Sequence, residues 1–227
     1  MSMLTPVDPP ASLTEQAVAA LRREILTTRL MPGETLSESS AATMLGLGKA
    51  PVRAALARLA EEGLVQAVPR RGWVVSLVTV RDIHEVFGLR LLLEPEAARR
   101  AAGRVDAEAL RRLDAVCACG YRPEDEESTH AFLAANKAFH VAVAELSGNG
   151  RLARQIDRLL DESTRMLTLG LRTRDRTGEM AHEHHALIEA LALGRAEQSA
   201  AIMREQVAAS HRMVLAALTA PDSSTAI

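Results

Sequence analysis

Basic side chains gather in one short part of this chain, in a pattern suited to binding the phosphates and base edges of nucleic acid. Lys49 and Arg53 are four residues apart, on one side of an expected helix, and Arg70 and Arg71 stand in an expected turn. An arginine can make a bidentate contact with guanine or phosphate, whereas a lysine offers a point charge. The whole chain has a net charge of −2, but five basic and two acidic residues leave residues 48–73 with a charge of +3. This local excess indicates a nucleic-acid contact surface.

The elements expected around these residues follow the order of a winged helix-turn-helix. Ser37 is a suitable N-cap for a short helix, and the turn at Leu45–Gly48 leads into a second helix. Two short strand-forming runs, residues 64–68 and 73–77, then predict a hairpin. Such modules commonly read duplex DNA through the major groove. The core-facing stripe of the second helix recurs at helical spacing at Val52, Leu56 and Leu59.

The composition of the chain favours packed helices. Hydrophobic residues form 48% of its 227 residues and aromatic residues only 2%, so cores must be built from Ala, Leu, Val and Ile. We expect a mainly α protein with an N-terminal winged helix-turn-helix and a C-terminal antiparallel helical bundle. The helices of the bundle are expected at residues 79–102, 106–119, 128–147, 149–170, 176–193 and 195–217. The expected parts are a disordered arm at 1–11, a DNA-binding domain at 12–78, an effector-binding and dimerisation domain at 79–218, and a flexible tail at 219–227.

Other classes of function lack a matching motif. No run approaches the ~18 apolar residues of a membrane span and no segment resembles a signal peptide, so we expect a cytoplasmic protein without a membrane partner. Cys117 and Cys119 are expected on different faces of a helix, which suits neither a disulfide nor a zinc knuckle. The run 182–185, HEHH, lacks the second histidine of H-E-x-x-H because position 186 is alanine. We therefore expect no enzyme.

Several segments of the chain resemble one protein family. The DNA-binding domain of GntR-type bacterial transcription regulators is similar to GETLSESSAATMLGLGKAPVRAALARLAEEGLV followed by PRRGWVV. The all-helical effector domain of the fatty-acid-regulator-like branch of this family is similar to RLLLEPEAARRAA, NKAFHVAVAELSGN and EHHALIEAL. The resemblance covers roughly residues 12–218.

This resemblance implies roles for residues of the first domain. Lys49 stands at the start of the recognition helix, Arg53 belongs to the PVR motif, and Gly72 is the wing glycine that would let the backbone approach DNA. The chain departs from the family pattern where Ala50 replaces a hydroxyl residue and Ser39 replaces a common arginine. The expected DNA-contact residues are Ser39, Lys49, Ala50, Arg53, Arg70, Arg71 and Gly72.

The resemblance also implies a site inside the bundle, where relatives often hold a divalent metal. The positions of the usual aspartate and three histidines are occupied here by Asn136, His140, His184 and Gln206. Two neutral amides replace usual ligands, so this set would hold Zn²⁺ or a similar ion only weakly. The competing interpretation is an organic ligand bound directly by the same residues together with Arg90, and regulators of this type commonly sense small organic acids. A buried polar network without a ligand is the third interpretation.

These features predict a ligand-responsive regulator that binds a short inverted repeat in double-stranded DNA as a homodimer. One winged domain buries little area and reads few bases, so two are needed for useful specificity. A repressor released or re-oriented by a small organic acid is the favoured hypothesis, and activator action stays open. A metal sensor and a metal-dependent enzyme are the alternatives.

Overall fold

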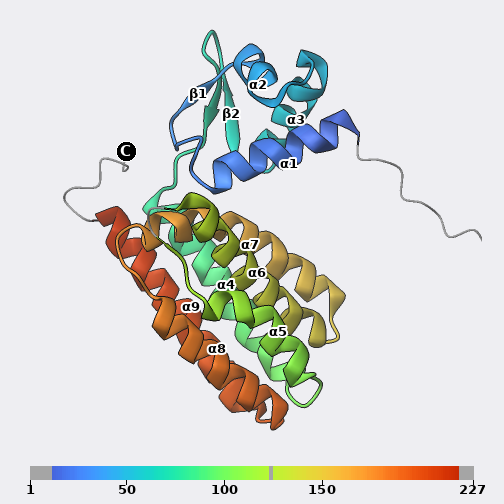
Figure 1. The fold of residues 1–227 in the computed structure, drawn as a ribbon, viewed down its shortest axis with the longest axis vertical. Helices are drawn as coiled ribbons and strands as arrows, with labels where there is room; N and C mark the ends of the chain where they lie inside the picture. Colours follow the sequence, from blue (N-terminus) through green and yellow to red (C-terminus); the bar gives the residue numbers. More distant parts are fainter. Residues whose placement is uncertain (1–11, 123–124, 220–227) are drawn as a thin grey trace, which may run out of the picture. The chain divides into compact units, whose positions relative to one another are not determined.

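The computed structural model describes residues 12–122 and 125–219, and the chain divides into two compact units between Leu77 and Val78 (Figure 1). Each unit encloses its own apolar core, as expected of a domain. The expectations of a disordered arm at residues 1–11 and of a flexible tail beyond Thr219 lie outside the described residues.

The first unit is a winged helix-turn-helix. Its three helices share one core with a small antiparallel sheet, whose strand order is β1-β3-β2. The register places Thr35 opposite Val74 and Val65 opposite Val75. The elements are α1 (Leu13–Leu26), β1 (Thr35–Leu36), α2 (Glu38–Leu45), α3 (Lys49–Glu61), β2 (Val65–Val68) and β3 (Gly72–Val75).

Capping explains where the first helices begin. Ser12 and Glu15 form a reciprocal capping box at the start of α1, and the hydroxyl of Ser37 accepts a hydrogen bond from the backbone N–H of Ser40 at the start of α2. The predicted apolar stripe of α3 is fully buried in the core of the unit. Local sequence therefore sets the starts of α1 and α2 and the face that α3 buries.

Two details of the first unit differ from the prediction. The apolar stripe that begins at Ala17 and the run Met31-Pro32-Gly33 predict a first helix that is stopped by a turn at residues 31–33, but this helix ends at Leu26. The hydroxyl of Thr27 donates a hydrogen bond to the carbonyl oxygen of Arg23. Thr28 has a φ of 57°, a left-handed conformation that ends a right-handed helix. Strand β1 was not predicted, because two residues are too short for an alternating pattern.

The second unit, within the described residues, is the predicted antiparallel bundle of six helices (Figure 1). Helix α4 packs on α6, α7 and α9, whereas α5 packs on α6 and α8. No helix of the described residues is both long and apolar enough to cross a membrane. The helices are α4 (Val80–Ala101), α5 (Ala107–Ala118), α6 (Glu126–Leu146), α7 (Gly150–Leu171), α8 (Thr177–Ala192) and α9 (Ala196–Thr219).

Charged and polar side chains lie inside the otherwise apolar bundle. Arg90 and Glu94 of α4 are each 2% exposed, and the two imidazoles, His140 of α6 and His184 of α8, are 5% and 2% exposed. Burying such groups is costly unless they are paired or hydrogen-bonded. Their partners therefore decide what the interior of the bundle can bind.

Candidate functional sites

The start of α3 is the first candidate site, because its exposed residues face away from the core. Lys49, Ala50 and Arg53 are exposed in the first turns of this helix. Gly48, the N-cap residue, makes no side-chain cap, so the first backbone N–H groups of α3 are left for other acceptors. A helix N-terminus with free N–H groups and neighbouring cations suits a DNA phosphate.

Arg53 is held by Glu38, a residue whose role no sequence motif predicts. Its Nε lies 2.8 Å from Oε1 of Glu38, and its Nη2 lies 2.7 Å from Oε2 of the same carboxylate. The hydrogen bond from Arg53 lowers the pKa of Glu38. Glu38 lies at the start of α2, so this ion pair joins the two helices of the helix-turn-helix. Their separation of fifteen positions leaves no local pattern that could predict it.

The tip of the β2–β3 hairpin carries the second group of predicted DNA contacts. Arg70 and Arg71 are both exposed there. The backbone N–H of Arg71 donates to the carbonyl of Val68 at 3.0 Å, which closes a tight turn with Pro69 in its second position. Arg70 has a φ of 65°, a conformation that non-glycine residues rarely adopt. The turn therefore presents two adjacent guanidinium groups on a strained backbone.

Gly72 has a structural role besides the predicted approach to DNA. Its φ is 86°, and a Cβ atom at this position would lie 3.1 Å from the carbonyl oxygen of Leu36. Both features favour glycine where β3 pairs with β1. Ser39 is also exposed, in the first turn of α2, so all seven predicted DNA-contact residues lie on the surface of the unit.

The second candidate site is a pair of buried imidazoles inside the bundle. The ring centroids of His140 and His184 are 5.6 Å apart in a T-shaped arrangement. Phe139 stacks on His184 with a centroid distance of 4.1 Å. The two predicted histidines are therefore brought together, whereas His182 and His185 are exposed.

Each imidazole is oriented by a carboxylate. Nδ1 of His140 lies 2.7 Å from Oε2 of Glu94, and Nδ1 of His184 lies 2.6 Å from Oδ1 of Asp114. A carboxylate at Nδ1 leaves Nε2 of the ring for a ligand, as in many metal-binding histidines. Neither carboxylate could be predicted from the sequence, because they stand 46 and 70 positions from their histidines and no short motif links them.

Arg90 is occupied by an internal partner. Its Nε donates to Oε1 of Glu94 at 2.6 Å, and its Nη1 donates to the hydroxyl of Ser163 at 3.1 Å. Burial alone would raise the pKa of Glu94, but the charges of Arg90 and His140 and their hydrogen bonds outweigh it and lower that pKa to about 2. The carboxylate that the sequence predicted for Arg90 is thus already supplied by Glu94.

The two amides of the predicted site have unused hydrogen-bonding groups. Among the described residues, Oδ1 of Asn136 and both Oε1 and Nε2 of Gln206 are buried without a partner. Such orphaned atoms are uncommon in folded proteins and indicate a bound water, ion or ligand. These atoms and the ring nitrogens together can donate and accept hydrogen bonds or coordinate a cation.

Comparison with known proteins adds to this geometry. Residues 13–75 match the bacterial regulatory proteins of the gntR family, and residues 85–209 match the FCD domain. An uncharacterized HTH-type transcriptional regulator in an unstable DNA locus of Streptomyces ambofaciens is 29% identical over 190 residues, covering 83% of this chain and 79% of that protein. The HTH-type transcriptional repressor RspR of Escherichia coli is 31% identical over 114 residues, which span 50% of each chain.

A solved structure shares the fold. The structure of E. coli McbR/YncC superposes with a TM-score of 0.72 at 24% identity, covering 89% of this chain and 98% of that one. Both of these relatives are named as transcriptional regulators. The chain therefore belongs to the GntR family of bacterial regulatory proteins, and its winged helix-turn-helix is followed by an FCD domain.

Proposed function

We propose that the protein is a ligand-responsive repressor that binds a short inverted repeat in duplex DNA, in the bacterial cytoplasm. The observation that carries this proposal is the exposed cationic set at the start of α3 and at the tip of the hairpin. The second helix of a helix-turn-helix enters the major groove, which would place Arg53 at a base edge or phosphate. Arg70 and Arg71 would bind phosphates beside it. RspR is named a repressor, which supports the proposed sign of regulation.

A homodimer is part of this proposal. Leu89 and Leu92 are neighbours on α4 and are 49% and 71% exposed. A pair of large exposed leucines on one helix favours contact with a second copy of the chain. Two DNA-binding units could then read two half-sites about 10 base pairs apart. Leu92→Glu is expected to yield monomers in native mass spectrometry, and a wild-type monomer would contradict the proposal.

We further propose that the effector is a small organic acid bound between the two imidazoles and the two amides. The amide N–H groups of Gln206 can donate to a carboxylate, and Oδ1 of Asn136 can accept from a hydroxyl. Arg90 would act through Glu94, which it holds against His140. Binding would change operator affinity by altering how the two units are held, and a coupling of about 1–3 kcal/mol is sufficient.

The same residues could also hold a divalent metal such as Zn²⁺. The orphaned oxygens of Asn136 and Gln206 and the oriented rings of His140 and His184 fit a cation, although this donor set is neutral and would bind weakly. A bound cation would supply positive charge to the centre of the bundle. Glu94 and Asp114 would fix the orientation of the two rings.

Arg53→Ala tests the assigned DNA face. Operator sequences would first be selected from a random DNA library with the wild-type protein, and affinities would then be measured by fluorescence anisotropy. We expect Arg53→Ala to lose roughly tenfold or more in affinity, since a bidentate base contact contributes about 1–3 kcal/mol. Arg58→Ala removes the same charge from the far half of α3 and is the matched control. Unchanged affinity in Arg53→Ala, or equal losses in both variants, would contradict the assignment.

A further inference from the structure

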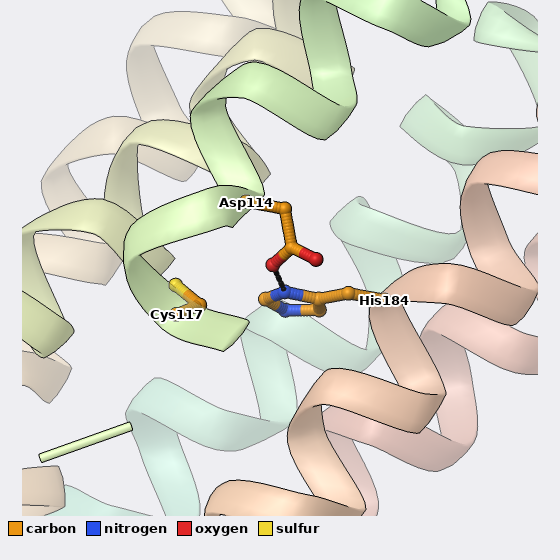
Figure 2. Close-up of side chains that lie close together, drawn as sticks. All are labelled: Asp114, Cys117 and His184. Atoms are coloured by element: carbon orange, nitrogen blue, oxygen red, sulfur yellow. Dashed lines mark hydrogen bonds and ion pairs between the residues drawn. The ribbon is translucent and has the colours of Figure 1, made fainter. Parts of the chain in front are cut away.

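We propose that Asp114, Cys117 and His184 form a thiolate-containing binding site for a transition-metal ion, best suited to Zn²⁺ (Figure 2). This donor set differs from the four residues of the proposed effector site and shares only His184 with it. The site is defined by side chains inside the second unit, so it does not depend on the proposed repressor function.

The three side chains converge from two helices. Asp114 and Cys117 are three residues apart on α5 and therefore share one face, and α8 packs against α5 and supplies His184. One ligand atom from each residue lies within 4.8 Å of the other two, and all three residues are buried. Figure 2 shows the Asp114 carboxylate joined to Nδ1 of the His184 ring, with Cys117 beside that ring. Ligand atoms of tetrahedral zinc lie roughly 3.3–3.8 Å apart, so small side-chain rotations would close the site.

The chemistry of the donors selects the ion. Thiolate and imidazole ligands favour Zn²⁺, whereas Mg²⁺ and Ca²⁺ prefer sites made of oxygen alone. Three protein ligands leave the fourth tetrahedral position for water or another small donor. A metal at Nδ1 of His184 would replace the hydrogen that Asp114 and His184 share.

The chain contains its own control for this proposal. It has two cysteines, of which Cys117 is buried and Cys119 is exposed. The thiol of Cys117 has a weak partner, the carbonyl oxygen of Phe132 at 3.8 Å, so little hydrogen bonding is lost when it becomes a ligand. Cys119→Ser therefore leaves a full-length protein in which any metal–thiolate bond must come from Cys117.

Cobalt titration of the full-length protein tests the site. Co²⁺ substitutes for Zn²⁺, and a cobalt–thiolate bond gives a near-ultraviolet charge-transfer band that nitrogen and oxygen ligands do not give. We expect this band in the wild type and in Cys119→Ser, its loss in Cys117→Ser, and its displacement by Zn²⁺. Cys117→Ala serves as a second variant if the serine variant does not fold, as judged by circular dichroism.

Several outcomes would overturn the proposal. Wild-type protein that binds no Co²⁺, or binds it without the charge-transfer band, has no thiolate site. A band that is lost in Cys119→Ser also contradicts it. Cobalt binding without this band that is abolished by Gln206→Ala would assign the metal to the amide-containing set instead. DNA binding of the same samples is measured separately, so failure of the metal site and failure of the regulator proposal can be told apart.

Discussion

Arg53 on α3 and Glu38 on α2 form a two-point ion pair, with Nε–Oε1 and Nη2–Oε2 distances of 2.8 and 2.7 Å. The carboxylate fixes the guanidinium before DNA is present. It also places a negative charge next to the residue proposed to meet the phosphates or bases. The pair is therefore expected to favour selective DNA binding at the expense of general affinity.

Glu38→Gln is expected to tighten binding to random-sequence duplex DNA by roughly three- to tenfold at low salt, because the variant removes a repulsive charge and frees Arg53 for a phosphate. The slope of log affinity against log salt should become steeper by about 0.9, the value for one additional phosphate contact. Fluorescence anisotropy over a salt series measures both quantities.

Glu62→Gln is the matched control for this prediction. Glu62 pairs with Arg22 in the same unit, so the variant removes the same charge away from the start of α3. An equal gain in affinity for both variants would assign the effect to net charge alone and reject a specific role for Glu38.

Arg70→Gly is expected to separate stability from DNA binding. Glycine tolerates the φ of 65° at this position, so the free energy of unfolding should rise by roughly 0.5–1 kcal/mol while DNA affinity falls. Arg71→Gly loses the same charge without relieving such strain, so its free energy of unfolding should fall. Urea unfolding followed by the fluorescence of Trp73, the single tryptophan of the chain, measures this difference. Stability changes of the same sign in both variants would rule out the strain argument.

Gly72→Ala is expected to destabilise the first unit by about 2–3 kcal/mol, because it combines a left-handed backbone with a close approach to the carbonyl of Leu36. Gly63→Ala supplies the comparison. Gly63 has a φ of 75°, but a Cβ there would meet no atom within 4 Å, so its cost should be limited to roughly 1 kcal/mol. Urea titration with the Trp73 signal tests this, and equal losses would show that the β1–β3 contact contributes nothing.

Glu94→Gln is expected to destabilise the bundle at pH 7 by about 3 kcal/mol, because folding lowers the pKa of Glu94 from 4.5 to about 2. Ionised Glu94 stabilises the folded state fully above pH 4.5, and this contribution is lost as the pH falls from 4.5 toward 2. The difference between variant and wild type should therefore shrink at pH 3. Circular dichroism of urea unfolding in the presence of a chelator measures it.

Glu96→Gln is the control for the buried pair, because Glu96 lies on the same helix and pairs with Arg99 and Arg100 near solvent. It should change stability little. A variant of Glu94 that is as stable as this control at pH 7 would show that the Arg90–Glu94–His140 cluster adds no net stability.

Features encoded locally could be predicted from the sequence. The N-cap at Ser37 and the approximate bounds of the bundle helices follow from short patterns, and the structure contains them. The burial of His140 and His184 followed from the family resemblance. The carboxylate partners could not be predicted in this way. Glu38 meets Arg53, Glu94 meets His140 and Asp114 meets His184 only when separate helices pack together. In the sequence, a single carboxylate on an amphipathic helix resembles an ordinary surface residue.

Strand β1 has a consequence for how DNA specificity could change. Leu36, just before the helix-turn-helix, is the direct partner of Trp73, just after the hairpin turn. The segment between these two residues carries α2, α3, β2 and the hairpin tip, and its two ends are adjacent in the sheet. Helix α3 packs on α1, and β2 pairs with β3, so this segment shares its core with the flanking chain. Exchange of the operator-reading segment for that of a relative is therefore expected to require β3 and the core-facing residues of α1 to be exchanged with it.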